Sequence, residues 1–294
     1  MEYQHIPVLL QEAIDLLDVK QDHWYIDATF GRGGHTKEII DRGGKVLALD
    51  QDKEAIAYGA RYFIREIEDK NLILVRENFE HTDEVSHTHL PGVKLDGILA
   101  DFGISSPQVD DPKRGFSFQS DAPLDMRMDD RMGVRAKDLV NGLGKKELYE
   151  ILTHYAQEQH ARIIVDAIIR ARTRKQIETT QELANIIEKV VHRHGHLHPA
   201  TKTFQALRIV INDELGSIER FLPRAFELLA VGGRLVTIAF HEGEDRLVKK
   251  FEQELEGQKK AEMLTKRPTE PSDQEMEKNP RSRSGKLRGI KRIL

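Results

Sequence analysis

A glycine-rich turn between two apolar runs constrains the fold of this chain more than any other feature. The first apolar run ends in Asp27 and is followed by Thr29-Phe30-Gly31-Arg32-Gly33-Gly34-His35 and an amphipathic segment. The second apolar run, Lys45–Leu49, ends in Asp50. Such an order is typical of strand, tight turn, helix and strand in an α/β sheet. The pattern predicts this unit over roughly residues 24–50.

The turn also indicates a ligand that contains a nucleoside. Glycines leave room for a ligand, and the free N–H groups at a helix start favour an anionic or electron-rich group. Asp50, about twenty residues past the turn, suits the two hydroxyls of a ribose. The spacing departs from the dinucleotide fingerprint, and Asp27 would repel a pyrophosphate, so a cationic cofactor such as S-adenosylmethionine fits better. A glycine-rich turn without a ligand is the alternative.

Two further apolar runs, 72–75 and 95–100, predict two more strands of a parallel sheet. Because ligands bind beyond the carboxyl ends of such strands, we expect the polar residues at the strand exits to ring one site. These residues are Asp27, Asp50, Asn78 and Asp101. Asp101 is the candidate for contact with a substrate amine, and an acid that merely caps the next segment is the alternative.

The alternation of strands and helices stops after the fourth strand. Residues 106 to about 205 carry a loop rich in proline, glycine and aspartate, and then only helical patterns. A helix over about 205–229, stopped by Gly232-Gly233, returns the chain to the sheet. The sequence thus predicts a sheet domain over 1–105, an inserted helical domain over 106–205, and the rest of the sheet domain with a basic tail over 206–294.

The composition excludes several classes of chemistry. The chain has no cysteine, so disulfides, cysteine-ligated zinc and a cysteine nucleophile for methylation at carbon 5 of a pyrimidine are all excluded. No run is long enough for a membrane span, and the first residues do not resemble a signal peptide, so we expect no membrane contact and a cytoplasmic location.

Neither of two candidate metal sites is favoured by the sequence, and metal dependence stays open. Histidines alternate over 192–198, but no nearby carboxylate completes a ligand set, and a polar loop explains them better. Asp125, Asp129 and Asp130 are interleaved with Arg127 and Arg131, which favours a salt-bridged loop over a magnesium site.

Two basic clusters in a chain of net charge −4 favour a polyanionic partner. One cluster lies in the helical region and the other in the tail. They comprise Arg170, Arg172, Arg174 and Lys175, and then Arg281, Arg283, Lys286, Arg288, Lys291 and Arg292.

Taken in order, these motifs resemble the RsmH (MraW) family, and the resemblance covers essentially the whole chain. The matching motifs include Asp27-Ala28-Thr29-Phe30-Gly31-x-Gly33-Gly34-His35, Ser105-Ser106-Pro107-Gln108, Arg114-Gly115-Phe116-Ser117-Phe118, Pro123-Leu124-Asp125-Met126-Arg127-Met128 and Asn279-Pro280-Arg281-Ser282-Arg283-Ser284. The chain departs from the family in two places. It has Glu242-Gly243 where the family usually has Ser-Leu, and Ala156-Gln157 where the family usually has Gly-Glu.

The resemblance implies a Rossmann-like, class I S-adenosylmethionine-dependent methyltransferase sheet with an inserted all-helical domain that recognises the substrate. It implies methyl transfer to the exocyclic N4 of a cytidine in the decoding region of 16S ribosomal RNA, with the small ribosomal subunit as partner. The cofactor positions that it implies are Gly33, Gly34, His35, Asp50, Phe79, Asp101 and Gln108.

For the reaction itself, we expect Asp101 to contact the reacting centre, and Phe102 or Phe116 to stack on the target base. Arg281, Arg283 and Arg288 are expected to hold the RNA backbone. Two other functions stay open: a non-catalytic cofactor-sensing RNA-binding protein, and a methyltransferase with a protein or small-molecule substrate. The sequence also leaves the oligomeric state open, and a homodimer is one alternative.

Overall fold

The computed structural model describes residues 7–192 and 198–294, which divide into two compact units. The first unit comprises Met1–Gly103 and Leu215–Leu294, and the second comprises Ile104–Glu214. Among the described residues, no helix is both long enough and apolar enough to cross a membrane.

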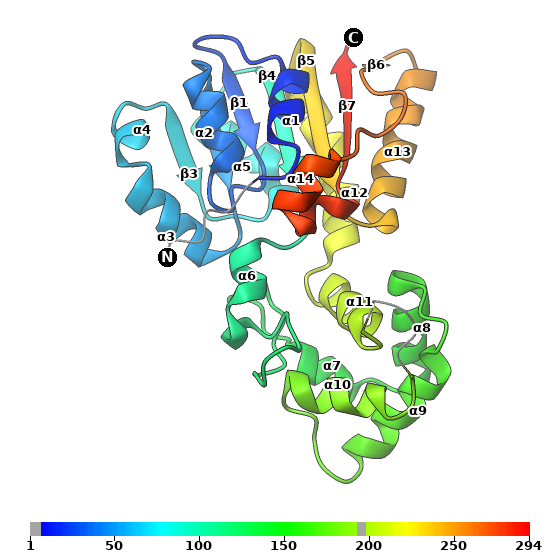
Figure 1. The fold of residues 1–294 in the computed structure, drawn as a ribbon. Coiled ribbons are helices and arrows are strands. Elements are labelled where there is room, and N and C mark those ends of the chain that lie inside the picture. The colour runs from blue at the N-terminus through cyan, green and yellow to red at the C-terminus, as the bar shows by residue number, and fades with distance from the viewer. Residues whose placement is uncertain (1–6, 193–197) are drawn as a thin grey trace. The chain divides into compact units, whose positions relative to one another are not determined.

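The first unit is built on a seven-stranded sheet with the order β3-β2-β1-β4-β5-β7-β6 (Figure 1). The strands are β1 (Trp24–Asp27), β2 (Lys45–Leu49), β3 (Leu72–Val75), β4 (Leu95–Asp101), β5 (Leu229–Ala239), β6 (Ala261–Met263) and β7 (Lys286–Arg292). The first five run parallel, and β7 is antiparallel to both of its neighbours. The predicted βαβ unit and the parallel sheet are confirmed.

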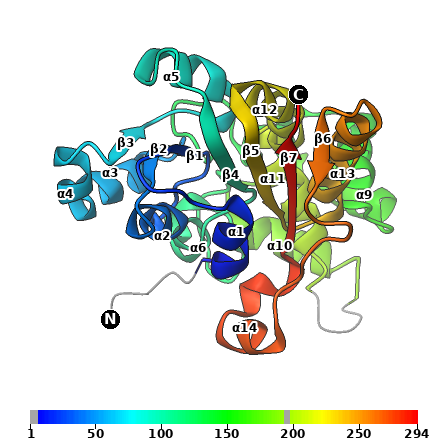
Figure 2. The ribbon, with the colours of Figure 1, turned by 90° about the horizontal axis from the view of Figure 1, so that it is seen from above.

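Helices cover both faces of this sheet, which explains why its inner strands are apolar throughout. Because successive side chains of a strand point to opposite faces, Ile26 packs in one core with Phe221, and Tyr25 packs in another with Ile14. Figure 2 shows α1 and α2 on one side of the sheet and α5 and α12 on the other. The helices of this unit are α1 (Leu10–Leu17), α2 (Gly34–Asp41), α3 (Lys53–Tyr62), α4 (Ile64–Glu68), α5 (Thr82–His89), α12 (Glu214–Leu228), α13 (Glu242–Gly257) and α14 (Asp273–Lys278).

The second unit is helical and has a core of its own. Apolar residues four positions apart, such as Leu148 and Leu152 or Ile164 and Ile168, lie on the same side of their helices and are buried there. Its helices are α6 (Ser106–Asp110), α7 (Ala136–Gly142), α8 (Lys145–Ala156), α9 (Ala161–Arg172), α10 (Thr180–Glu188) and α11 (Thr201–Ile211). The short 3₁₀ turn η2 (Pro112–Arg114) also lies in this unit, and η1 (Phe79–His81) and η3 (Pro280–Ser284) lie in the first unit.

The helical unit extends beyond residue 205, the end that the sequence predicts for it. That residue lies within α11, and Phe204, Leu207 and Ile211 of this helix are buried in the helical core. The unit therefore ends at Glu214, after α11 is complete.

The helix expected over 205–229 is in fact two helices, because the chain turns at Asn212 and Asp213. Asn212 accepts a hydrogen bond from Met128 N at 2.7 Å and donates to Met126 O, and Asp213 has a φ of 45°. Gly232-Gly233, predicted to end a helix, lies inside β5.

The basic tail is also more ordered than its composition suggests. Lys286–Arg292 form β7, which pairs antiparallel with β5 and buries Leu287 and Ile290. Only two large apolar residues mark this strand among its cations, so the sequence gives little sign of it.

Candidate active site

Three aspartates lie at one edge of the sheet, where neighbouring parallel strands end. Asp27 is the last residue of β1, Asp101 is the last residue of β4, and Asp50 directly follows β2. Asp27 pairs in register with Ala48 on one side and Leu99 on the other, so the three exits lie side by side. Asn78 follows β3, the next strand along. The structure thus brings together the residues expected to ring one site.

Asp27 holds the glycine turn to the strand that precedes it. Its buried carboxylate accepts hydrogen bonds from Thr36 Oγ1 at 2.6 Å and from Thr29 N at 3.1 Å. Burial raises the pKa of Asp27 to about 6 in spite of these bonds. This carboxyl therefore contributes negative charge beneath the turn from near-neutral pH upward.

Asp50 is bound to the same turn from the neighbouring strand. Its Oδ2 accepts from Gly31 N at 2.8 Å, and its Oδ1 accepts from Asp52 N at 2.8 Å. Burial raises the pKa of Asp50 to about 7. Because each carboxylate oxygen has two lone pairs, both oxygens can still accept from the hydroxyls of a ribose.

Asp101 presents an unsatisfied polar atom at this edge. Its backbone N–H donates to Thr29 Oγ1 at 2.7 Å, while its Oδ1 is buried without a hydrogen-bond partner among the described residues. Burial raises the pKa of Asp101 well above its ordinary range, and the negative charges of Asp27 and Glu244 raise it further. A buried carboxyl oxygen without a hydrogen-bond partner in the protein indicates that a ligand or substrate group binds there.

The glycines of the turn are required by the protein's own packing. Gly33 has a φ of 74°, and a Cβ placed on it would lie 2.5 Å from the ring of Phe63. A Cβ on Gly34 would lie 2.1 Å from Pro7 Cγ. The close approach at these positions is thus between the turn and protein side chains, and the chain cannot accept alanine there without moving.

His35 begins the helix after the turn and is kept neutral. It is buried, and burial lowers its pKa to about 4. Its Nε2 has no hydrogen-bond partner within the described ranges. This second unsatisfied atom beside the turn adds to the case for a ligand.

Of the aromatic residues expected at the site, Phe79 is partly exposed and Phe102 is buried. Phe79, the first residue of η1, is partly buried, and its ring centroid lies 5.7 Å from that of Phe102 and 5.3 Å from that of Phe221. Phe102 is only 2% exposed. Phe102 therefore belongs to the core of the sheet unit and has no open face for a target base, contrary to the expectation from sequence.

The two candidates in the helical unit have structural contacts of their own. Gln108 is buried in α6, and its Oε1 accepts from Ser105 N at 3.0 Å, so it closes the first turn of that helix. Phe116 is buried in the helical core, with the guanidinium of Arg114 near its ring. The expected stacking of a base on Phe116 is likewise not available, because its ring is covered.

The three tail arginines separate into two groups. Arg281 and Arg283 lie in η3 and are exposed. Arg288 is buried in β7, and its Nε donates to Asp245 Oδ1 at 2.7 Å. The assignment of Arg288 to the RNA backbone is therefore corrected: its guanidinium is used inside the fold.

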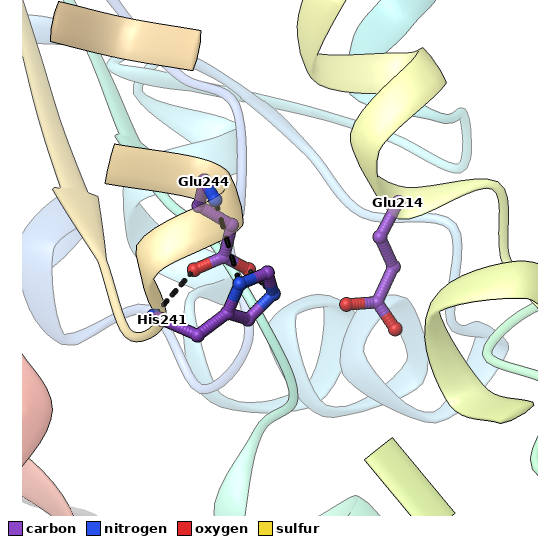
Figure 3. Close-up of side chains that lie close together, drawn as sticks. All are labelled: Glu214, His241 and Glu244. Atoms are coloured by element: carbon purple, nitrogen blue, oxygen red, sulfur yellow. Dashed lines mark hydrogen bonds and ion pairs between the residues drawn. The ribbon is translucent and has the colours of Figure 1, made fainter. Parts of the chain in front are cut away.

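The exit of β5 carries a pair that sequence reasoning missed (Figure 3). Glu244 is fully buried, and its Oε2 accepts from Phe240 N at 2.7 Å and from His241 N at 3.2 Å. His241 Nδ1 accepts from Gly243 N at 3.1 Å. Its Nε2 lies 3.2 Å from Glu244 Oε1, but neither of these two atoms has a hydrogen-bond partner among the described residues. This capping box fixes the start of α13. Glu214, also drawn, begins α12 and is paired with Arg208 at 2.7 Å.

The capping box also explains one departure from the family pattern. A Cβ on Gly243 would lie 3.1 Å from the imidazole of His241, so glycine leaves room for the ring to fold over the helix start. The other departure lies at the end of α8, where Ala156 is the last helical residue and Gln157 follows with a φ of 49°. Neither departure changes the edge that carries Asp50 and Asp101.

The residues considered for metals form ion pairs instead. Arg127 Nε lies 2.7 Å from Asp125 Oδ1, and Arg131 Nη2 lies 2.7 Å from Asp129 Oδ2, as the salt-bridged loop predicts. Residues 193–197 of the histidine-rich segment lie outside the described residues, and His198 pairs with Glu188 at 2.7 Å.

The strand order, with its antiparallel β7, is that of class I S-adenosylmethionine-dependent methyltransferases, so the predicted fold class is confirmed.

Comparison with known proteins also identifies methyltransferases as relatives of this chain. Three curated relatives are each named "Ribosomal RNA small subunit methyltransferase H". The protein of Caldicellulosiruptor saccharolyticus is 43% identical, with 99% of this chain and 100% of the relative covered. The protein of Limosilactobacillus fermentum is 41% identical with 99% of each covered, and that of Carboxydothermus hydrogenoformans is 42% identical with 100% and 99% covered. Residues 2–293 match the MraW methylase family, to which this chain therefore belongs.

Proposed function

We propose that this protein transfers a methyl group from S-adenosylmethionine to the exocyclic N4 of a cytidine in the decoding region of 16S ribosomal RNA. The observation that carries the proposal is the buried Asp101 Oδ1, which has no partner among the described residues and lies beside the glycine turn. Membership of the methylase family and the names of the full-length relatives support the reaction class and the RNA substrate.

The residues around the turn fit a cofactor that carries positive charge. Asp50 offers carboxylate oxygens to the ribose hydroxyls, and Asp27 and Asp101 supply negative charge near a sulfonium and an ammonium group. His35 offers Nε2, and Phe79 offers a partly exposed ring. Gln108 is proposed as a contact on the family resemblance alone. When bound, the cofactor supplies an electrophilic methyl group.

The remaining chemistry is the handling of the amine. The N4 of cytosine is a weak nucleophile because its lone pair is delocalised into the ring, so it must be held in line with the methyl group. It must also lose a proton as positive charge develops on nitrogen. A carboxylate at Asp101 accepts a hydrogen bond from the amine and then its proton, and a raised pKa makes that carboxylate a better base.

The substrate and the reaction are tested in one assay. The protein is supplied with methyl-labelled S-adenosylmethionine and, separately, with small ribosomal subunits, free 16S ribosomal RNA or ribosomal protein, and the products are digested to nucleosides. We expect label in N4-methylcytidine, its loss in Asp101→Asn, and its retention in Asp121→Asn, a matched change at an exposed aspartate. Label in protein would contradict the RNA substrate, and cofactor binding without any transfer would identify a sensor.

A further inference from the structure

The helical unit carries an electropositive pocket that the sequence did not indicate. The pocket has a volume of about 530 Å³ and is lined by Lys145, Lys146, Tyr149, Arg162 and Val165. It lies over α8 and α9, which contact each other in the lower part of Figure 1. Three of its five lining residues are cations and none is an acid.

These three cations lie at the N-termini of α8 and α9, where the helices themselves carry partial positive charge. Lys145 and Lys146 are the first two residues of α8, and Arg162 is the second residue of α9. The N-terminus of a helix carries partial positive charge, and acids are the stabilising residues there. At the start of α8, Glu147 offsets part of this charge and accepts a hydrogen bond from Gly144 N, whereas α9 has no acid in its first turn and Arg162 adds to its field. Such an arrangement is relieved when an anion binds.

Lys145 is held in a close ion pair, whereas Lys146 is paired only weakly. Lys145 Nζ lies 2.5 Å from Asp166 Oδ1, and Lys146 Nζ lies 3.8 Å from Glu150 Oε1. The side chains of the second pair are 87% and 61% exposed, so water screens the attraction. Within the described part of the chain, no carboxylate lies within ion-pair distance of the Arg162 guanidinium, although Asp166, one turn further along α9, interacts with its charge. Two of the cations are thus available to a phosphate.

Tyr149 gives the pocket an aromatic surface next to its charges. It lies four residues after Lys145, on the same side of α8, and it is 45% exposed. Half-exposed aromatic rings beside Lys and Arg are typical of surfaces that bind single-stranded nucleic acid, where a base stacks and its phosphate is paired. A purely ionic site for an acidic peptide would not need the ring.

We propose that this pocket binds one nucleotide of a single-stranded RNA segment. Lys146 and Arg162 pair with the phosphate, and the base stacks on Tyr149. The identity of that RNA as ribosomal rests on the proposed function, whereas the recognition of a nucleotide rests on the pocket itself.

The charge contribution is tested with Lys146→Gln/Arg162→Gln, which leaves the pair between Lys145 and Asp166 in place. The matched control is Lys249→Gln/Lys250→Gln, which removes two exposed cations from α13. Binding of a labelled single-stranded 16S ribosomal RNA fragment is followed by fluorescence anisotropy over a series of salt concentrations. We expect roughly tenfold weaker binding at low salt and a salt slope smaller by about 0.7, because the contacts to one phosphate are lost. The control should keep the slope of the unmodified protein.

The stacking contribution is tested separately with Tyr149→Phe and Tyr149→Ala. Phenylalanine keeps the ring and should bind the RNA within twofold of the unmodified protein. Alanine should bind roughly five- to twentyfold more weakly, with an unchanged salt slope, because stacking is insensitive to counterions. Equal affinity of the two variants would overturn the assignment of the base to Tyr149.

Failure of this inference is distinguishable from failure of the proposed function. If the unmodified protein methylates the RNA but Lys146→Gln/Arg162→Gln binds it as the control does, the pocket proposal is overturned and the function stands. If no methyl transfer occurs but the variant still loses RNA binding, the function fails and the pocket stands. Loss of binding to the assembled subunit alone would assign the pocket to a ribosomal protein and overturn the RNA proposal. Circular-dichroism melts confirm that each variant is folded.

Discussion

The carboxylate of Asp50 accepts a hydrogen bond from the backbone N–H of Gly31 at 2.8 Å. One acid therefore does two things: it holds the glycine turn against the end of β2, and it presents its remaining lone pairs to a ribose. The turn and the acid, separated by about twenty residues in sequence, are one unit in the fold.

Replacement of Asp50 separates these two roles. Asp50→Asn keeps a carbonyl oxygen for Gly31 N, so the turn stays attached to β2, but it loses the acceptor for Asp52 N and the charged acceptor for the ribose. We expect S-adenosylmethionine to bind roughly 10- to 100-fold more weakly, since a hydrogen bond to a charged group contributes about 1.5–3 kcal/mol. Isothermal calorimetry measures the change. Asp41→Asn, at an exposed helix end, is the control, and comparable weakening in both variants would argue against a ribose contact.

The raised carboxyl pKa values make the ligand-free protein sensitive to pH. The pKa of Asp27 is about 6 and that of Asp50 about 7, against 3.8 for an ordinary aspartate. Between about pH 4 and pH 7 these carboxyls hold more protons in the folded protein than in the unfolded chain. They outweigh His35, whose pKa of about 4 acts in the opposite direction, so the free energy of unfolding falls as pH rises. Melts at a series of pH values should show this decrease, and a flatter curve in Asp50→Asn. Rising stability over that range would contradict it.

The same groups predict how cofactor binding responds to pH. A cationic ligand favours the ionised carboxyls, so its affinity should increase as pH rises through about 6 to 7, and binding should release protons. Calorimetry in two buffers of different ionisation enthalpy measures the number released. Uptake of protons near pH 6 would show that Asp27 and Asp50 do not face the positive charge.

The pair of Arg288 and Asp245 should contribute to stability and not to RNA binding. Although burial acts to raise the pKa of Asp245, the guanidinium of Arg288 and the ammonium of Lys286 hold it below the usual range. Arg288→Ala leaves this acid without its main partner, and we expect a loss of about 3–5 kcal/mol in the free energy of unfolding. Arg283→Ala, at an exposed position, should change it by less than about 0.5 kcal/mol. Equal melting temperatures would refute the contrast.

The exposed arginines of η3 are the tail residues suited to an RNA backbone. Arg281→Ala/Arg283→Ala should weaken binding to a single-stranded 16S fragment and reduce its salt slope by about 1.4. Thermal stability should stay near that of the unmodified protein, since neither side chain is buried. An unchanged slope in the anisotropy titration would remove the tail from the RNA contact.

Glu244 should influence the reaction through Asp101. Its negative charge raises the pKa of Asp101, after the larger effect of burial. Glu244→Gln keeps a side-chain oxygen for the N–H groups of Phe240 and His241 but removes the charge. We therefore expect the acid limb of the pH–rate profile of methyl transfer to move to lower pH. Glu242→Gln, at an exposed neighbour, should leave the profile in place, and identical profiles for all three proteins would rule out this coupling.

The parallel sheet and the ring of acids were readable from the sequence because they depend on local patterns and chain direction. Short, mainly apolar segments mark β1–β4, and parallel strands necessarily bring Asp27, Asp50 and Asp101 to the same edge. The pair of His241 and Glu244 also has a local signal in the sequence, the spacing of a capping box after an apolar strand.

Burial of single side chains, in contrast, was decided by the tertiary structure. Nothing in the sequence around Phe102 and Phe116 distinguishes them from exposed stacking residues. Phe102 packs against Phe221, and Phe116 is buried in the helical core. Arg288 has the sequence surroundings of a solvated tail, yet strand pairing with β5 and an acid on α13 draw it inside. The sequence by itself determined where strands end and which charges meet there. Contacts between segments far apart in the chain decided which rings and cations remained accessible to a ligand. Local sequence patterns do not indicate such contacts.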